Sequence, residues 1–248
     1  MHVPDGLLDL PVLAATWAAT CGYAAFAIRK SRKSLTEERV PVLGVLAAVV
    51  FAFQMLNFPI SAGTSGHLLG FVLVAALTTP TAAFLVMFVI LAIQALMFAD
   101  GGVLSLGANV FNMGVVTLLG YWVFLAVRKR LNSAASTEVL GAGSTDSGSL
   151  GPEKRGGAET QPPVERELVV GGLVGGWVSV VAASLVAGVE LGASSAFPYG
   201  LVVTVPVMLG YHVVIGLGEG LITAATLAFF SRYAPEHVPA PNEQEWLN

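Results

Sequence analysis

Residues 82–98 read AAFLVMFVILAIQALMF and hold no charged side chain. A helix that crosses the apolar core of a bilayer takes about 17 to 25 such residues. Comparable stretches lie elsewhere in the chain, near residues 10–28, 41–58, 66–79, 106–127, 168–189 and 201–230. The sequence therefore predicts an all-α fold, a polytopic bundle of seven transmembrane helices.

The composition supports a membrane protein. Of 248 residues, 55% are hydrophobic and 11% are charged, whereas a soluble domain carries roughly 25% charged residues. This composition excludes a secreted disulfide scaffold, a nucleic-acid binder and a soluble enzyme. The single cysteine, Cys21, lies in an apolar run and has no partner for an internal disulfide.

Turn-forming residues divide the chain. The sequence Thr78-Thr79-Pro80 predicts a helix restart because proline suits the first helical turn and disfavours helix in the residue before it. Residues 132–165 are rich in Ser, Gly, Thr and Pro, which is typical of a flexible linker. We expect a membrane domain at 1–131 with helices one to five, a cytoplasmic linker at 132–165, helices six and seven at 166–233, and a cytoplasmic tail at 234–248.

The basic residues predict the orientation. All 12 Lys and Arg residues lie within 29–39, within 128–166 and at position 232. With seven spans and the N-terminus outside, each of them falls on the cytoplasmic side, as the positive-inside rule requires. If the short segment 66–79 were re-entrant, the cluster at 128–130 would lie outside. Seven spans, with a cytoplasmic C-terminus, is therefore the favoured count.

The first two residues offer metal donors. We expect the chain to keep Met1 with a free amine, since no basic segment typical of a signal peptide precedes the first apolar run. The Met1 amine, the deprotonated amide nitrogen of His2 and the His2 imidazole can form fused chelate rings around one ion. His67, expected at the same membrane face, is a candidate fourth nitrogen. Such a planar set suits Ni(II) or Cu(II), with Co(II) also possible. The alternative is that His2 is incidental and His67 caps a helix.

Five short motifs carry a family resemblance. They are MHVPDGLL at residues 1–8, AGTSGHLLG at 62–70, QALMFADGG at 94–102, LGANVFNM at 106–113 and GYH at 210–212. In this order they resemble the CbiM/NikM proteins, the substrate-binding (S) components of energy-coupling-factor transporters for cobalt and nickel. The resemblance covers nearly the whole chain apart from 132–165.

The resemblance implies a function and a ligand set. It implies that Met1 and His2 hold Co²⁺ or Ni²⁺ through the terminal amine, a backbone amide and the His2 imidazole, and that His67 completes the site. The opening Pro4-Asp5-Gly6 is closer to the cobalt members, so cobalt is favoured over nickel. The implied location is the bacterial or archaeal cytoplasmic membrane, with the chain as a multi-pass protein in the lipid bilayer.

The energy for uptake must come from partners. The chain holds no Gly-x-x-x-x-Gly-Lys-Ser/Thr sequence to cradle a nucleotide phosphate, so we expect a transporter subunit that is not an enzyme. The resemblance names the partners as a transmembrane coupling (T) subunit and cytoplasmic ATPases, with a small accessory membrane subunit in some systems. Small-residue stripes at Ala14/Ala18/Gly22 and at 171–176 could serve either a partner or internal packing.

Three ionisable residues leave alternatives open. Asp100 precedes two glycines and predicts a turn, with a hydrogen bond to a ligand histidine as the sharper possibility. His212 and Glu219 lie on one face of the last helix, where an internal structural bond is favoured over a polar track.

A rival function is an intramembrane serine protease of the rhomboid type, using Ser65 and His212 in hydrogen-bond contact. We expect Ser65 at the outer boundary and His212 near mid-helix, which disfavours the pair. A self-sufficient channel or carrier is a further alternative, but one intramembrane carboxylate gives it little proton-relay machinery.

Overall fold

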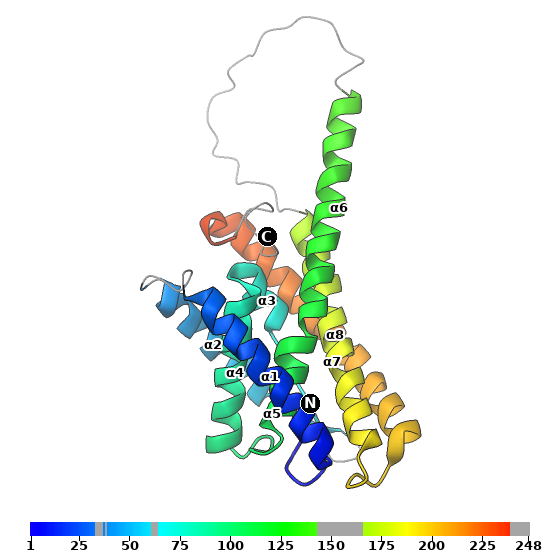
Figure 1. The fold of residues 1–248 in the computed structure, drawn as a ribbon. Coiled ribbons are helices and arrows are strands. Elements are labelled where there is room, and N and C mark those ends of the chain that lie inside the picture. Colours follow the sequence, from blue (N-terminus) through cyan, green and yellow to red (C-terminus); the bar gives the residue numbers. More distant parts are fainter. Residues whose placement is uncertain (33–36, 38, 61–63, 143–165, 239–248) are drawn as a thin grey trace, which may run out of the picture.

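The computed structural model describes residues 1–32, 37, 39–60, 64–142 and 166–238. Within them the chain is almost entirely helical, apart from one short antiparallel hairpin (Figure 1). The elements are α1 (Leu10–Ser31), α2 (Arg39–Met55), β1 (Phe58–Ile60), β2 (Thr64–Gly66), α3 (Phe71–Leu77), α4 (Pro80–Met97), α5 (Leu106–Val110), a π-helical segment (Phe111–Val116), α6 (Leu118–Ala142), α7 (Arg166–Ala193), α8 (Gly200–Tyr233) and a 3₁₀ turn (Pro235–His237).

The described part of the chain contains five helical stretches that are long and apolar enough to cross a membrane. They are Leu10–Ser31, Pro80–Met97, Leu106–Ser133, Arg166–Ala193 and Gly200–Tyr233. The stretch in α4 is 56% buried inside the protein, whereas that in α1 is 17% buried. The helix quoted at the outset is therefore central, and α1 leaves most of its apolar surface for lipid or for a partner.

The restart predicted at Pro80 is confirmed. Pro80 begins α4, and the Thr79 hydroxyl accepts a hydrogen bond from the Ala82 N–H at 3.0 Å. This cap satisfies one of the free N–H groups of the first turn. The predicted separation at Asp100 is also present, because α4 ends at Met97 and α5 begins at Leu106.

The third predicted helix, 66–79, is wrong as a continuous span. Only Phe71–Leu77 are helical, and they follow β2 and an extended stretch. Gly70 has φ +77°, which prevents the helix from starting earlier. The Glu219 carboxylate accepts hydrogen bonds from the N–H groups of Leu69 and Gly70 at 2.9 and 2.7 Å. A partner from α8 thus satisfies a backbone that has no helical bonds of its own, as burial in a membrane requires.

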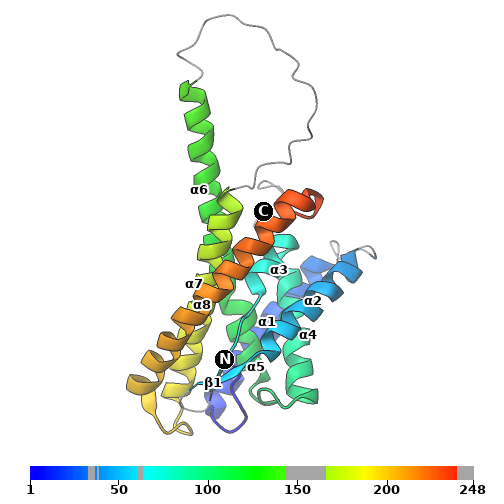
Figure 2. The same cartoon turned by 180° about the vertical axis from the view of Figure 1, so that it is seen from behind.

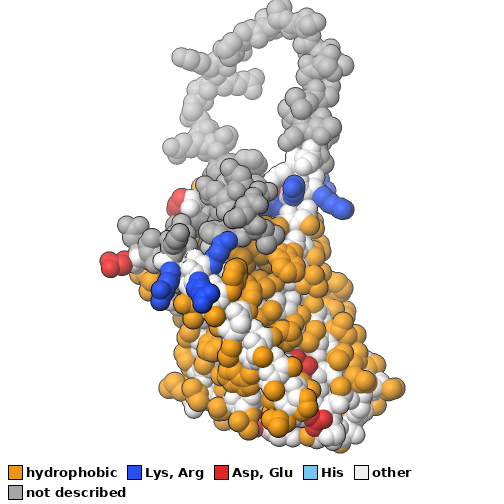
Figure 3. Space-filling view, in the orientation of Figure 1, with side chains coloured by type: hydrophobic (Ala, Val, Ile, Leu, Met, Phe, Trp, Pro, Cys, Tyr) orange, Lys and Arg blue, Asp and Glu red, His pale blue; other side chains and the backbone are white. Residues whose placement is uncertain are grey.

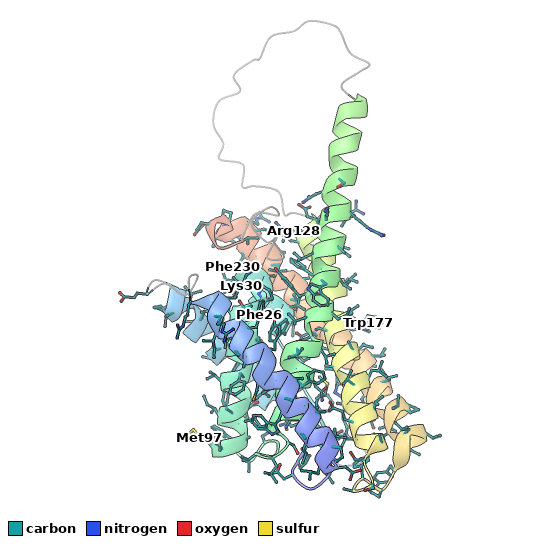
Figure 4. All side chains as sticks on the ribbon, viewed as in Figure 1. Phe26, Lys30, Met97, Arg128, Trp177 and Phe230 are labelled. Atoms are coloured by element: carbon teal, nitrogen blue, oxygen red, sulfur yellow. The ribbon has the colours of Figure 1, made fainter. Side chains whose placement is uncertain are left out.

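The ends of the bundle differ in character. The Lys and Arg side chains visible in Figure 3 gather toward one end, above a surface that is mainly apolar. Figure 4 places Lys30 and Arg128 toward that end and Met97 toward the other. The N-terminus and β1 lie together away from the basic end (Figure 2).

Glycines on α7 allow close helix packing. A Cβ at Gly175 would lie 2.7 Å from the Gly120 carbonyl oxygen on α6, and one at Gly176 would lie 3.0 Å from the Gly220 Cα on α8. The stripe at 171–176 therefore serves internal packing. In contrast, a Cβ at Gly22 on α1 would meet nothing within 4 Å.

The helix α6 continues to Ala142, past residue 132 where we expected the linker to start. The remainder of that predicted linker, 143–165, and residues 239–248 of the predicted tail lie outside the described residues.

Candidate metal-binding site

The N-terminal segment is docked into the protein by Asn109 of α5. The Val3 N–H donates to Asn109 Oδ1 at 2.8 Å, and Asn109 Nδ2 donates to the Val3 carbonyl at 3.1 Å. The same carbonyl accepts from the Gly102 N–H at 2.9 Å. Val3 is fully buried, so its backbone needs these partners.

Asp5 fixes the loop that follows α4. Its two carboxylate oxygens accept hydrogen bonds from the N–H groups of Val103 and Ser105, at 3.0 and 2.9 Å. The Ser105 hydroxyl returns a bond to the Pro4 carbonyl at 3.1 Å. The start of the chain and residues 102–109 thus form one hydrogen-bonded unit.

The Met1 amine is enclosed next to β2. It contacts the Ser65 carbonyl oxygen and lies 3.3 Å from the Ser65 hydroxyl. Burial lowers the pKa of the Met1 ammonium from 8.0 to about 4, although Asp100 opposes the shift. The amine is therefore neutral near pH 7, and a neutral amine has the lone pair that a metal needs.

His67 presents an unprotonated nitrogen to the interior. Its Nδ1 lies 2.8 Å from the Leu68 carbonyl oxygen, and a carbonyl can only accept, so Nδ1 carries the proton. The lone pair is then on Nε2, which is buried without a hydrogen-bond partner. A backbone bond of this kind is the usual way in which a metal-binding histidine is held in one tautomer.

His2 stacks on His67, with ring centroids 4.4 Å apart and planes 19° from parallel. Its Nδ1 lies 3.1 Å from Asp100 Oδ1, and its Nε2 lies 3.1 Å from Gln94 Oε1. Burial lowers the pKa of His2 below 6.5, against the opposing effect of Asp100.

The pKa of the Asp100 carboxyl group is lowered by the groups around it. Burial, the largest single effect, would raise the pKa of this carboxyl group, but the hydrogen bond and charge of His2, the Met1 ammonium and the Asn57 hydrogen bond together outweigh it. The expectation that Asp100 bonds a candidate ligand histidine is thus met by the geometry.

These residues fit a small divalent transition metal by their chemistry. The buried His67 Nε2 has no hydrogen-bond partner, His2 Nδ1 faces the Asp100 carboxylate at 3.1 Å, and burial of the Met1 amine favours its neutral form. The described residues contain no group of three or more His, Cys, Asp or Glu side chains that could hold a metal. The Met1 amine and the His2 backbone amide are the further nitrogens that lie next to the His2 imidazole in the chain.

His212 and Glu219 of α8 both make structural hydrogen bonds. His212 Nδ1 lies 2.7 Å from the Met208 carbonyl one turn earlier, and Glu219 holds the backbone before α3. The His212 Nε2 atom has no hydrogen-bond partner, so His212 makes no bond to Ser65. A serine–histidine protease pair is therefore not supported.

Three contacts were not expected from the sequence. Gln94 bonds His2, Asn57 Nδ2 donates to Asp100 Oδ2 at 2.7 Å, and Asn109 clamps Val3. Gln94, a polar residue inside the uncharged stretch 82–98, could have indicated such a contact, because polar side chains within a membrane span usually have a functional or structural partner.

Comparison with known proteins places the chain among metal transport proteins. The family described as the cobalt uptake substrate-specific transmembrane region, CbiM, matches residues 2–150 and 155–237. A putative fused nickel transport protein NikMN of Archaeoglobus fulgidus is 36% identical over 240 residues, covering 95% of this chain and 67% of that protein. A putative metal transport protein of Haloquadratum walsbyi is 35% identical over 239 residues, covering 96% and 93%.

A solved structure, described as a truncated transition metal transporter, superimposes with a TM-score of 0.74 at 30% identity. It covers 96% of this chain and 100% of that one. The helical bundle and these similarities define a multi-pass membrane protein of the cobalt and nickel transport class. The chain belongs to the CbiM family.

Proposed function

We propose that this chain is the substrate-capturing subunit of an energy-coupling-factor transporter that takes up Co²⁺ or Ni²⁺. The ion is held by the Met1 amine, the His2 amide nitrogen, His2 Nδ1 and His67 Nε2. The observation that carries the proposal is the burial of the Met1 amine against Ser65, next to the residues whose imidazole rings, His2 and His67, are stacked on each other. The naming of the Archaeoglobus relative for nickel and of the family for cobalt supports this cargo.

When the ion binds, nitrogen atoms of the protein replace water molecules that were coordinated to the ion. The ion gives up its water ligands as the amine and the two imidazole nitrogens replace them, and the His2 amide loses its proton to become the remaining planar donor. Fused chelate rings through Met1 and His2 favour ions that accept a planar nitrogen set, so Mg²⁺ and Ca²⁺, which prefer oxygen, are rejected. Because binding releases protons, affinity rises with pH.

The site faces the outside of the cytoplasmic membrane. The basic side chains visible in Figure 3 lie toward the opposite end of the bundle from the N-terminus marked in the same orientation in Figure 1, and the positive-inside rule places such residues in the cytoplasm. The third pass through the bilayer consists of β2, the extended residues after it and α3. With that pass included the chain crosses seven times, and the C-terminus is cytoplasmic.

Release of the ion requires partners. The chain carries no nucleotide-binding loop in its sequence, so a transmembrane coupling subunit, cytoplasmic ATPases and in some systems a small membrane subunit supply the work. The exposed small-residue stripe of α1, which includes Gly22, offers a surface for close helix contact.

The test is a titration of purified protein with Co²⁺ and Ni²⁺. We expect about one ion per chain when Met1 is the authentic start, since one constellation supplies all four nitrogens. One extra residue before Met1 should abolish binding, and the same extension at the C-terminus is the matched control. Unchanged binding after the N-terminal extension would refute the amine ligand.

A competition titration between Co²⁺ and Ni²⁺ determines which of the two ions the protein prefers. The sequence opening Pro4-Asp5-Gly6 favours cobalt, whereas the Archaeoglobus relative is a putative nickel transport protein. A titration of one ion against the other on the same sample gives the ratio of dissociation constants directly.

A further inference from the structure

The three side-chain and terminal donors of the proposed site have almost no contact with solvent. Met1 is 0% exposed, His2 3% and His67 1%. A hydrated divalent ion therefore cannot reach these nitrogens without first meeting a group nearer the surface. That group must also compensate for the water that the ion loses on entering.

Asp100 occupies such a position. Its side chain is 16% exposed, and its Oδ1 lies 3.1 Å from His2 Nδ1. The Asp100 carboxylate is therefore both accessible to solvent and in contact with His2 Nδ1, one of the proposed ligand atoms. The other acidic side chains described near this end are engaged elsewhere: Asp5 with the N–H groups of Val103 and Ser105, Asp9 with Ser195, and the buried Glu190 with Asn112.

The backbone around Asp100 is built to hold it there. Ala99 has φ +53° and Gly101 has φ +86°, so the carboxylate stands between two left-handed residues. A non-glycine residue in this region is strained and persists only where its surroundings enforce it. The Asp100 N–H donates to the Gln94 carbonyl at 3.0 Å, and Asn57 holds Oδ2 at 2.7 Å. These bonds fix the carboxylate while leaving Oδ1 directed at His2.

From this geometry we infer that Asp100 is the capture ligand of the site: it binds the incoming ion first through a carboxylate oxygen and passes it to His2 Nδ1. The inference rests on the proposed function. A carboxylate exchanges readily with the water of a divalent ion, and nitrogen donors then displace it because cobalt and nickel bind them more strongly. A fixed negative charge at the mouth also raises the local concentration of cations.

Gln94 completes the transfer. Without an ion, His2 Nδ1 faces Asp100 Oδ1 and His2 Nε2 faces Gln94 Oε1, each at 3.1 Å. Once the metal takes the Nδ1 lone pair, the proton must reside on Nε2, where Gln94 Oε1 accepts it at the observed 3.1 Å. An amide side chain offers both an acceptor and a donor, so the same residue supports His2 in both states.

The experiment measures association and dissociation rates by stopped flow. Full-length protein with the authentic start is mixed with Ni²⁺ alone or Co²⁺ alone, and release is followed with a chelator in excess. For Asp100→Asn we expect the association rate to fall about tenfold, the lower end of electrostatic steering effects, with a dissociation rate within about twofold of the original. Raising the salt concentration should slow the original protein more than the variant.

Asp9→Asn is the matched control, because it removes the same charge at the same end of the protein from a carboxylate that accepts hydrogen bonds from the Ser195 N–H and hydroxyl. Its association rate should remain close to that of the original protein, and Asp100→Glu should restore part of the loss. An unchanged association rate for Asp100→Asn, or a loss that appears only as faster dissociation, would overturn the inference. If the original protein binds neither ion, the proposed function itself fails.

Discussion

If the proposed metal site is correct, the docking of the N-terminal segment by Asn109 should contribute to the affinity for metal. The substitution Asn109→Ala leaves the buried Val3 N–H without its acceptor at 2.8 Å, while the Val3 carbonyl keeps its bond from Gly102. An orphaned buried donor costs about 1–3 kcal/mol. Since each 1.4 kcal/mol corresponds to a factor of ten, metal binding should weaken roughly 5- to 150-fold.

Calorimetric titration of the full chain with Ni²⁺, in competition with a chelator, measures this change. Thr20→Val is the matched control, because it removes one buried hydrogen bond to the same helix α5, from the Thr20 hydroxyl to the Gly107 carbonyl at 2.8 Å. Both variants should lose some thermal stability, but Thr20→Val should bind within about twofold of the original protein. Equal affinities for all three proteins would refute the view that docking of Val3 pre-organises the donors.

Further predictions concern the backbone, the membrane interior and pH. Gly101→Ala should weaken metal binding more than Gly6→Ala. Both glycines have φ near +85°, but a Cβ at Gly101 would lie 2.9 Å from Asn109 Nδ2, whereas one at Gly6 would meet nothing within 4 Å; equal effects on the dissociation constant would show that the collision is unimportant. Glu219→Gln leaves a single amide oxygen to accept from the two N–H groups of Leu69 and Gly70. The unfolding free energy should therefore fall by about 1–3 kcal/mol, as measured by thermal or denaturant unfolding. An unchanged stability would contradict the role of Glu219. The Met1 ammonium has a pKa of about 4 in the folded protein and an ordinary value of 8.0. The unfolded chain therefore binds more protons between these values, and the folded state should gain stability as pH rises from 4 to 8. Acetylation of the amine should remove that part of the pH dependence; a persistent slope would assign it to other groups.

Local signals in the sequence identify most of the helices. The predicted apolar stretches coincide with α1, α2, α4, the α5–α6 run, α7 and α8, because apolar length and a proline restart are properties of neighbouring residues. The segment that contains β2 and α3 cannot be identified from such local signals. Its backbone depends on Glu219, far away in sequence, and no local pattern shows that a carboxylate will satisfy the N–H groups of Leu69 and Gly70.

Some residues of the candidate site could be predicted from the sequence, whereas others are recognised only in the structure. Met1, His2 and His67 could be nominated because their atoms offer nitrogen donors, and the structure brings them together. Whether they bind metal stays a prediction. Gln94 and Asn109 support the site through long-range contacts, which depend on the packing of α4 and α5 against the N-terminal segment. Composition and spacing do not reveal such contacts.

The most direct measurement of the central claim is anomalous scattering at the cobalt or nickel absorption edge, from crystals of the protein with its authentic N-terminus and the ion bound. We predict one strong peak within bonding distance of the Met1 nitrogen, His2 Nδ1 and His67 Nε2. A peak elsewhere, or an N-terminal segment that points away from His67 while the ion is bound, would contradict the claim.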